Sequence, residues 1–237
     1  MSRHWCVVPA AGRGRRFGGE VPKQYLRLGE KPLLLHTLER LAAHPRIAGL
    51  MLVVAADDDG WAQGLVEVLG KPLLRARGGA ERADSVLAGL RALPQSVGLL
   101  DCVLVHDAAR PCVRAQDISR LLDLAVPAGG GLLAAPLRDT LKRADAQSRS
   151  VATEPRESRW RALTPQLFPR AALQAALADA SAAGVPVTDE AMAMERAGFA
   201  PLLVEGAEDN IKVTTPADLL LAEFLLANMD RIDRRLA

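Results

Sequence analysis

The sequence predicts an α/β fold in which a mostly parallel sheet carries helices on both faces and a β-hairpin arm projects from the core. Two observations support this prediction. Short apolar runs alternate with segments of helical periodicity along most of the chain. At residues 137–160 this alternation stops, apolar residues become sparse and charged residues crowd in. We therefore expect one sheet-based core and one extended arm.

The first buried strand is expected at "WCVVPAA" (5–11), which is a compact apolar run. Similar runs follow at regular intervals, and the one at 101–111, "DCVLVHDAARP", ends in polar residues. The remaining strands are expected at 49–56, 73–79, 130–136 and 200–206. Since helical segments separate most of these runs, neighbouring strands should be parallel.

The first helix is expected at "KPLLLHTLERLAAH" (31–44), where apolar residues recur at helical spacing and Pro32 stands near the first turn. The segment "ERADSVLAGLRALP" (81–94) has the same periodicity and is stopped by a proline. The other helices are expected at 58–70, 116–126, 169–182, 188–197 and 215–229.

The arm at 137–160 contains two short β-prone pieces, "TLKRA" (140–144) and "SVATE" (150–154), on either side of a polar turn. An isolated two-stranded hairpin is only marginally stable in water. We therefore expect this arm to pack against another surface.

Three polar motifs follow strand ends: "AAGRGRR" after the first strand, "GGAERADS" after the third and "HDAARP" after the fourth. Ligands of parallel α/β sheets bind outside the carboxyl ends of the strands. The three motifs are therefore expected to form one site.

The first of these motifs is a poor dinucleotide fingerprint, because Phe17 stands where the third glycine belongs and no acidic residue follows about 20 positions later. Hydride transfer is therefore disfavoured. Glycines let backbone N–H groups approach an anion, and Arg13, Arg15, Arg16 and Lys23 add charge suited to a polyphosphate. The alternative is a solvated, charge-rich loop.

The other two motifs also have competing interpretations. Asp107 at a strand end could hold a magnesium ion that bridges phosphate oxygens, or it could cap a turn. His106 is assigned to packing or to supporting hydrogen bonds. Arg82 and Ser85 lie where a glycine turn meets a helix, so they could read a base edge or belong to an ordinary capped helix. Lys212, in "EDNIKVTTP", would suit a phosphate.

Composition narrows the function classes. The formal net charge of +2 is too small for a general nucleic-acid surface. The three cysteines form neither a disulfide framework nor a CxxC metal pair, which favours reduced thiols. No segment is typical of a signal peptide or a membrane span. We expect a cytoplasmic protein that binds neither nucleic acid nor membranes.

Taken together, the motifs resemble one family over nearly the whole chain, the 2-C-methyl-D-erythritol 4-phosphate cytidylyltransferases. The resemblance is carried, in this order, by "VVPAAGRGRRFGGEVPKQY", "GGAERADSVLAGL", "VLVHDAARPCV", "APLRDTLKR", "LTPQLF", "VTDEAMAMERAG" and "VEGAEDNIKVTTPADL". It implies a single Rossmann-like nucleotidyltransferase domain over 1–237, an arm at 137–160 that joins two subunits into a homodimer, and a Mg²⁺-dependent reaction of CTP with methylerythritol phosphate.

The resemblance also implies roles for individual residues. Arg16 and Lys23 match those that stabilise charge at the reacting α-phosphate, and Arg156 and Lys212 match those that position the substrate phosphate. The positions that surround the nucleotide are Ala10, Ala11, Gly12, Gly79 and Ser85, and Arg82 is expected beside them from its place in the glycine-turn motif. Those near the methylerythritol phosphate or the metal are Asp107, Arg110, Thr140, Thr164 and Thr188. In "TEPRESRW", Pro155 and Arg159 depart from the family pattern, so either Arg156 or Arg159 could reach the substrate.

Two alternatives to this function stay open at this point. The first is a cytidylyltransferase for another polyol phosphate, such as ribitol 5-phosphate. The second is a non-catalytic nucleotide-binding regulator, which would be expected to lack the cations that act in the transition state. Arg16, Lys23, Asp107 and Lys212 are all present, which argues against the regulator.

Overall fold

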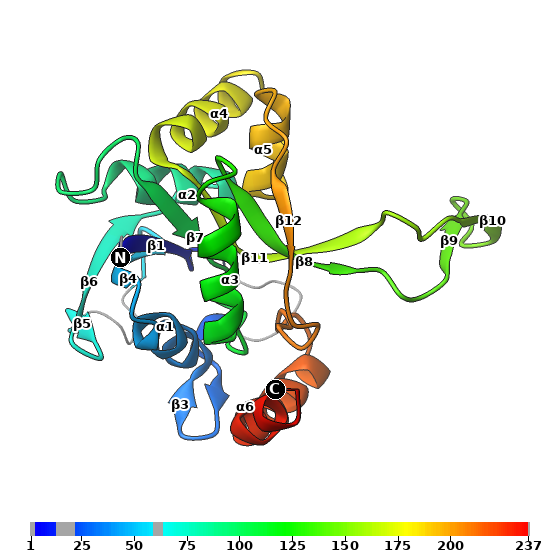
Figure 1. Ribbon diagram of the computed structural model, residues 1–237, viewed down its shortest axis with the longest axis horizontal. Helices are drawn as coiled ribbons and strands as arrows, with labels where there is room; N and C mark the ends of the chain where they lie inside the picture. The colour runs from blue at the N-terminus through cyan, green and yellow to red at the C-terminus, as the bar shows by residue number, and fades with distance from the viewer. Residues whose placement is uncertain (1–2, 13–21, 59–63, 237) are drawn as a thin grey trace.

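The computed structural model describes residues 3–12, 22–58 and 64–236, and Figure 1 shows their arrangement. Its centre is an eight-stranded sheet in the order β12-β8-β11-β7-β1-β4-β6-β5. The strands are β1 (His4–Pro9), β4 (Ile47–Val54), β5 (Glu67–Val68), β6 (Lys71–Arg77), β7 (Cys102–Val105), β8 (Gly131–Pro136), β11 (Trp160–Pro169) and β12 (Leu202–Glu205).

The prediction of a mostly parallel sheet is confirmed. Strand β1 is parallel to β4 and to β7, β4 is parallel to β6, and β12 is parallel to β8. Antiparallel pairs join β11 to β7 and β8, and β5 to β6. The carboxyl ends of β1, β6 and β7 consequently lie at one edge, where the three polar motifs meet.

Helices cover both faces of the sheet, as predicted. The helical segments are η2 (Lys23–Tyr25), α1 (Leu33–Ala43), α2 (Arg82–Arg91), α3 (Ala115–Ala125), α4 (Arg170–Ala182), α5 (Glu190–Arg196) and α6 (Pro216–Leu236). Successive β1 side chains alternate between faces. Cys6 and Val8 pack with α1 and α3, whereas Val7 packs with α2, α4 and α5.

Helix α6 lies apart from these two layers, at the opposite end of the molecule from α4 and α5 (Figure 1). It packs through Ala222, Leu225 and Met229 on a third apolar cluster, which includes Leu28 and Cys112. Leu28 belongs to a small hairpin formed by β2 (Arg27–Leu28) and β3 (Lys31–Pro32). The segment that follows the lysine-bearing turn η2 is thereby attached to the C-terminal helix.

The prediction of a helix at 58–70 is wrong for residues 64–70, which the structure describes and which contain no helix. Residues 67–68 form β5, which returns directly into β6 through a tight hairpin. The two linking residues, Leu69 and Gly70, have φ angles of 50° and 73°. Positive φ at both central positions is the signature of the primed hairpin turn, which helical periodicity does not reveal.

Strand β11 was not among the elements predicted from the sequence. Pro165 stands inside it, and proline is unusual within a sheet. The ladder with β8 shifts register between Ala162 and Gln166, and the proline falls in that interval. The irregular stretch brings Thr164 next to the end of β7, where the polar motif "HDAARP" begins.

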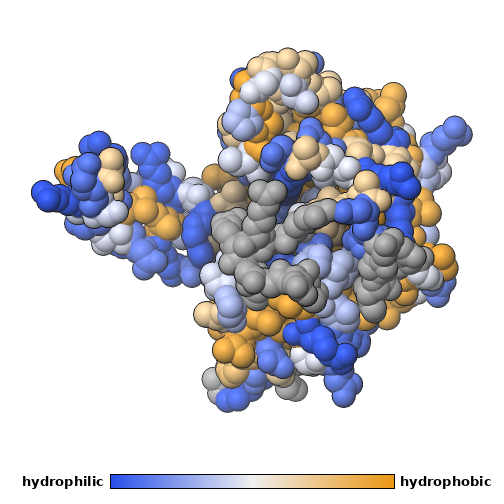
Figure 2. Space-filling view, turned by 180° about the vertical axis from the view of Figure 1, so that it is seen from behind, coloured by the Kyte–Doolittle hydropathy of each residue, from blue (hydrophilic) through white to orange (hydrophobic). Residues whose placement is uncertain are grey.

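The predicted arm is present as a hairpin of β9 (Leu141–Ala144) and β10 (Ser150–Glu154), and it extends beyond the ends of β8 and β11 (Figure 1). Asp145 closes its turn by accepting hydrogen bonds from the backbone N–H groups of Gln147 and Arg149 at 3.0 and 2.9 Å. The surface of the arm is predominantly hydrophilic (Figure 2). Among the described residues, no helix is long and apolar enough to cross a membrane.

Candidate active site

A pocket opens where the ends of β1, β6 and β7 meet, as the motif positions predicted. Its walls come from the residues after β1, the turn η2, the β6–α2 turn, the residues after β7 and the segment before α6. The lining residues are Pro9, Ala10, Ala11, Gly12, Lys23, Gln24, Gly79, Ala80, Glu81, Arg82, Ser85, Asp107, Ala108, Ala109 and Lys212. Small side chains and cations thus share one cavity.

The β6–α2 turn forms one wall because its glycines allow very close packing. A Cβ atom on Gly78 would lie 2.6 Å from Ser85 Oγ and 2.7 Å from Ala11 Cβ, and one on Gly79 would collide with Asp84. The buried Ser85 hydroxyl accepts a hydrogen bond from the Gly79 N–H at 3.2 Å and donates to the Glu81 carbonyl at 3.1 Å. Ser85 therefore shapes this wall through the backbone.

Asp107 is nearly buried and is surrounded by three cations. Arg82 Nε donates to Oδ1 at 3.0 Å, while Arg110 Nε and Lys212 Nζ lie 3.4 and 2.9 Å from Oδ2. Burial alone would raise the pKa of this carboxyl, but the three cations outweigh it and hold the pKa far below its ordinary value. The side chain is a carboxylate throughout the physiological range.

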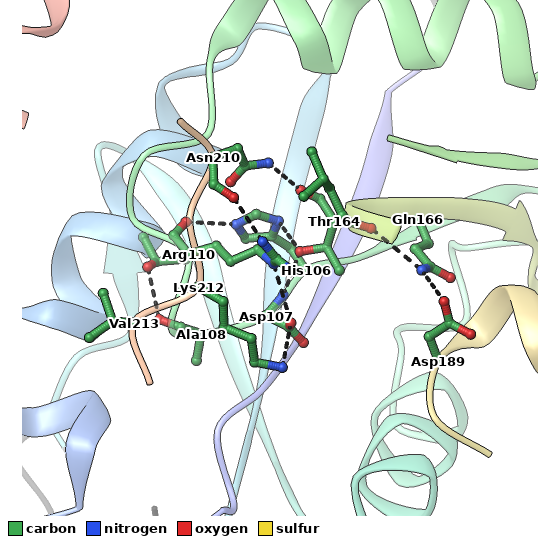
Figure 3. Close-up of polar contacts among 12 residues, drawn as sticks. His106, Asp107, Ala108, Arg110, Thr164, Gln166, Asp189, Asn210, Lys212 and Val213 are labelled. Atoms are coloured by element: carbon green, nitrogen blue, oxygen red, sulfur yellow. Dashed lines mark hydrogen bonds and ion pairs between the residues drawn. The ribbon is translucent and has the colours of Figure 1, made fainter. Parts of the chain in front are cut away.

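A hydrogen-bonded network lies beneath Asp107 (Figure 3). The backbone N–H of Asp107 donates to Thr164 Oγ1 at 3.1 Å, and this hydroxyl lies 2.9 Å from His106 Nδ1. His106 Nε2 lies 3.0 Å from the Arg110 carbonyl, which can only accept. His106 is therefore protonated on Nε2, and Thr164 donates to Nδ1. Burial lowers the pKa of His106 to about 4.

The segment before α6 is attached to the same network (Figure 3). The Asn210 side-chain amide donates to the Thr164 backbone carbonyl at 2.7 Å. The backbone carbonyl of Asn210 accepts from Arg110 Nη1 at 2.7 Å. The Val213 N–H donates to the Ala109 carbonyl at 2.8 Å. Lys212 is thereby held between two anchored residues, with its ammonium at the pocket.

Lys23 enters the pocket from the opposite side, on the short turn η2. Its Nζ donates to the Val213 carbonyl at 3.0 Å. The next residue, Gln24, is buried and donates to the Ala10 carbonyl at 2.8 Å. Two lysines from distant segments thus face one cavity, whose other wall is the glycine turn. This arrangement suits a polyanion with a small planar group attached.

Comparisons with known proteins agree with this geometry. The family model described as 2-C-methyl-D-erythritol 4-phosphate cytidylyltransferase matches residues 5–228. The chain belongs to this family. Relatives of that name from Xanthomonas axonopodis and Stenotrophomonas maltophilia are each 60% identical, over 95% and 94% of this chain and 85% and 96% of their own. A crystal structure of 4-diphosphocytidyl-2C-methyl-D-erythritol synthase is 34% identical and superposes with a TM-score of 0.81, covering 95% of this chain and all of the other.

Membership in the cytidylyltransferase family confirms the predicted enzyme class, a nucleotidyltransferase of isoprenoid precursor biosynthesis, and the predicted nucleotidyltransferase fold. The structure also brings most of the predicted site residues together. Those that line the pocket are Ala10, Ala11, Gly12, Lys23, Gly79, Arg82, Ser85, Asp107 and Lys212. Arg110 and Thr164 contact Asp107 from below.

Three described residues among the predicted site residues are not part of this cluster. Thr140 and Arg156 line a separate hollow on the arm. Thr188 is exposed on the segment before α5, where its hydroxyl lies 3.6 Å from the sulfur of Met192. Arg16 lies outside the described residues. The Arg156 guanidinium donates to the Arg138 carbonyl on the arm, and Arg159 is exposed there as well.

Glu190 was not predicted from the sequence as a site residue. It is a fully buried carboxylate whose oxygens accept from Arg82 Nη1 and Nη2 at 2.6 and 3.1 Å. A signal for it exists in the sequence. Ala193 and Met194, three and four positions later, are apolar and buried on the same helix face. An acidic residue at a core position of an amphipathic helix indicates a buried partner of opposite charge.

Proposed function

We propose that this chain transfers the CMP group of CTP to the 4-phosphate of 2-C-methyl-D-erythritol 4-phosphate and that the pocket at the ends of β1, β6 and β7 is where this occurs. The observation that carries the proposal is the convergence of Lys23, Lys212 and the Asp107 cluster on one glycine-walled cavity. Cytosine and ribose would lie against the glycine turn, and the triphosphate would extend toward the lysines.

The proposed chemistry is an in-line displacement. An oxygen of the 4-phosphate attacks the α-phosphorus of CTP, and the bond from that phosphorus to the β-phosphate oxygen breaks, so that pyrophosphate leaves. Both reactants are anions, and the transition state spreads negative charge over the phosphoryl oxygens. Lys23 and Arg16 would offset that charge, while Lys212 would hold the incoming phosphate.

The proposal needs no general base, because a phosphate monoester with a second pKa of about 6 is already ionised near neutral pH. His106, the histidine nearest the pocket, is consistent with this view. It is fully buried, and both of its ring nitrogens are engaged with Thr164 and Arg110. It would hold the Asp107 segment in place and take no part in proton transfer.

Mg²⁺ would enter as a complex with CTP. In the described part of the chain, no group of three or more His, Cys, Asp or Glu residues is arranged to hold a metal ion. Mg²⁺ commonly binds through one or two carboxylates together with substrate phosphates and water. Asp107 can supply that one carboxylate. The ion would neutralise charge on the phosphates.

The arm would complete the site of a second subunit in a homodimer. Thr140 and Arg156 line a hollow on the arm that shares no residue with the pocket, and the hairpin of this arm projects away from the core of its own chain (Figure 1). A two-stranded hairpin of polar surface gains little by standing alone in water. We infer that Arg156 of the partner subunit reaches the methylerythritol phosphate bound beside Lys212, and that Thr188 contributes from the rim.

The proposal also covers the number of domains and the cellular compartment. The family model spans residues 5–228, which supports a single catalytic domain. Cys6, Cys102 and Cys112 are free thiols, as is usual in a reducing compartment, and this supports a cytoplasmic enzyme.

The deciding experiment measures pyrophosphate release from CTP against a panel of polyol phosphates, with and without Mg²⁺. We expect release only when methylerythritol phosphate and the divalent cation are both present. Equal or faster turnover with ribitol 5-phosphate would transfer the assignment to that substrate. CTP binding without release from any polyol phosphate would favour a nucleotide-binding regulator.

A further inference from the structure

Behind Asp107 lies a second carboxylate that does not face the pocket. Glu190 is the first residue of α5, and none of its surface is exposed. Its two oxygens receive the two terminal nitrogens of Arg82 in a forked ion pair, at 2.6 and 3.1 Å. Such bidentate pairs fix the plane and position of a guanidinium far better than a single contact does.

The same guanidinium makes the next contact toward the pocket. Arg82 Nε donates to Asp107 Oδ1 at 3.0 Å, so a continuous chain of charge-assisted bonds runs from Glu190 through Arg82 to Asp107. Each of the three guanidinium nitrogens of Arg82 thus donates to a carboxylate. The arginine is therefore held behind Asp107, and its charge is shared between two anions.

The backbone around Glu190 is fixed independently. The Asp189 carboxylate accepts from the Met192 N–H at 3.0 Å and from Gln166 Nε2 at 2.9 Å (Figure 3). The Gln166 amide oxygen in turn accepts from the Ala191 N–H at 2.8 Å. Contacts from β11 thus clamp the residues on both sides of Glu190, so that its carboxylate has a defined position relative to the sheet.

We propose that Glu190 is a positioning residue for nucleotidyl transfer: it holds Arg82 behind Asp107, and so fixes the Asp107 carboxylate and limits the positive charge offered to the phosphates. This inference rests on the proposed role of Asp107 at the reacting phosphates. A buried ion pair can often be replaced by apolar residues without loss of stability. Stability alone therefore gives no reason for a charged pair at this position, whereas a fixed Asp107 does.

The proposal predicts that loss of Glu190 lowers the rate of catalysis while it strengthens the binding of anions. Without Glu190, Nη1 of Arg82 loses its carboxylate partner and Nη2 keeps only Asp107 Oδ1, at 3.0 Å, so the guanidinium is held from one side and can turn toward a bound polyphosphate. Anions would then bind more tightly in the ground state, while Asp107 and the reacting groups would be less well placed. A displacement of about 1 Å in a catalytic constellation can cost on the order of 10² in rate.

The test uses Glu190→Gln, which keeps the size of the side chain, and compares kcat, KM for CTP and the dissociation constant of inorganic pyrophosphate measured by calorimetry. We expect kcat to fall on the order of 10², with KM for CTP unchanged or lower. Pyrophosphate should bind roughly threefold more tightly or better, because one negative charge near the site has been removed. The matched control is Glu195→Gln, an exposed glutamate on the same helix, which should behave as the wild type.

A double variant separates positioning from folding. Arg82→Gln with Glu190→Gln removes both charges of the pair, so the melting temperature should recover relative to Glu190→Gln, while kcat stays low. Recovery of both properties would show that the single variant suffered only from an unpaired buried charge, and would overturn the proposal. If Glu190→Gln does not fold, wild-type kcat in the double variant overturns it equally.

Asp107→Asn distinguishes this inference from the proposed function beneath it. Full activity of the Asp107→Asn variant would show that the Asp107 carboxylate has no role in catalysis, and would reject the part of the proposed function on which this inference rests. An inactive Asp107→Asn enzyme beside a Glu190→Gln enzyme with wild-type kcat would leave the proposed function intact and reject the role of Glu190. Glu190→Gln with weaker pyrophosphate binding and a kcat loss that follows the loss of folded protein would also reject it.

Discussion

The ammonium of Lys212 lies 2.9 Å from Oδ2 of Asp107, so the cation proposed for the substrate phosphate stands beside the carboxylate proposed for the metal (Figure 3). A phosphate that enters the pocket can take over this ammonium. The carboxylate oxygen would then become available to a Mg²⁺ ion that arrives with CTP. Asp107 would then be the residue that holds the ion, and Lys212 the residue that holds the phosphate.

Replacing Lys212 should therefore affect the acceptor more than the nucleotide. We expect Lys212→Met to lower kcat/KM for methylerythritol phosphate about 10- to 100-fold. A loss of this size corresponds to the free energy of one hydrogen bond to a charged group. KM for CTP should change little. Steady-state kinetics with each substrate varied in turn will show this, and Lys31→Met, at an exposed lysine paired with Glu39, is the control. A loss confined to CTP binding would place Lys212 on the nucleotide.

Lys23 should act mainly on the transition state. Lys23→Ala is expected to lower kcat by about 10²–10³, the usual loss when one donor to a developing oxyanion is removed, while KM for CTP stays near its wild-type value. Arg16→Ala should behave in the same way on the evidence of its motif. Normal kcat with a raised KM for CTP would make either residue a ground-state binder instead.

His106 should make stability depend on pH between about 6.5 and 4. Burial lowers its pKa to about 4, whereas the unfolded chain takes up the proton near 6.5. The contribution of the neutral ring is complete above pH 6.5 and falls as the pH drops through this window. It amounts to about 3 kcal/mol in the free energy of unfolding.

Denaturant unfolding at pH 7.5 and 4.5 checks this, with His106→Gln as the comparison because that side chain does not titrate. The fall in stability between the two pH values should be about 2.5 kcal/mol smaller in the variant, because most of the contribution of His106 is lost by pH 4.5. The comparison is needed because burial also lowers the pKa of His44, whose effect has the same sign. Asp107 does not interfere, because its contribution is lost only near and below pH 4. Parallel curves for the two proteins would contradict the prediction.

The β5–β6 turn offers a stabilising substitution. Leu69 is 62% exposed and has a φ of 50°, a conformation that costs a leucine about 1 kcal/mol and that asparagine adopts more readily. Leu69→Asn should raise the free energy of unfolding by up to about 1 kcal/mol, measured by urea denaturation. Leu100→Asn, at an exposed leucine without positive φ, should give no gain. Equal gains in the two variants would show that replacing an exposed leucine by a polar side chain is the cause, whatever its φ angle.

The sequence predicts the architecture well where the pattern is local. Apolar runs such as "GLMLVVAA" correspond to buried strands, and the motifs around Gly79, Asp107 and Lys212 do meet at one sheet edge. The failures are nonlocal or stereochemical. A positive-φ turn at Leu69 decides strand against helix, and a register shift tolerates Pro165 inside β11. Neither property has a periodic signature.

For the site, too, the sequence predicts some features and not others. Residue types and their place after strand ends predict a polyanion pocket, because parallel strands deliver their carboxyl ends to one edge. The partners of each side chain cannot be read from the sequence, since they come from distant segments. Arg82 was predicted to face the nucleotide, and in the structure its guanidinium is held by Glu190 and Asp107. Tertiary contacts alone reveal such a pairing.

The last prediction concerns the arm and can be tested by complementation. Lys23→Ala and Arg156→Ala should each be nearly inactive alone, because one removes a pocket cation and the other removes the cation proposed to arrive on the arm. If arms are exchanged, a mixed dimer places both lesions in one site and leaves the other site intact. Random pairing would restore about a quarter of the wild-type activity, since half of the dimers are mixed and half of their sites are whole.

The converse arrangement gives a different result. If the arm served its own subunit, every site in a mixed dimer would keep one lesion, and unfolding and reassembling the two variants together would restore nothing. Sedimentation at assay concentration supplies the second readout, because a monomer could not share a site at all. In Figure 1 the hairpin of β9 and β10 projects away from the core of its own chain, and Thr140 and Arg156 line the hollow on this arm. Recovery of activity in the mixture is therefore the expected outcome. The control is Lys142→Ala, which changes an exposed arm lysine outside the hollow and should be as active alone as the wild type.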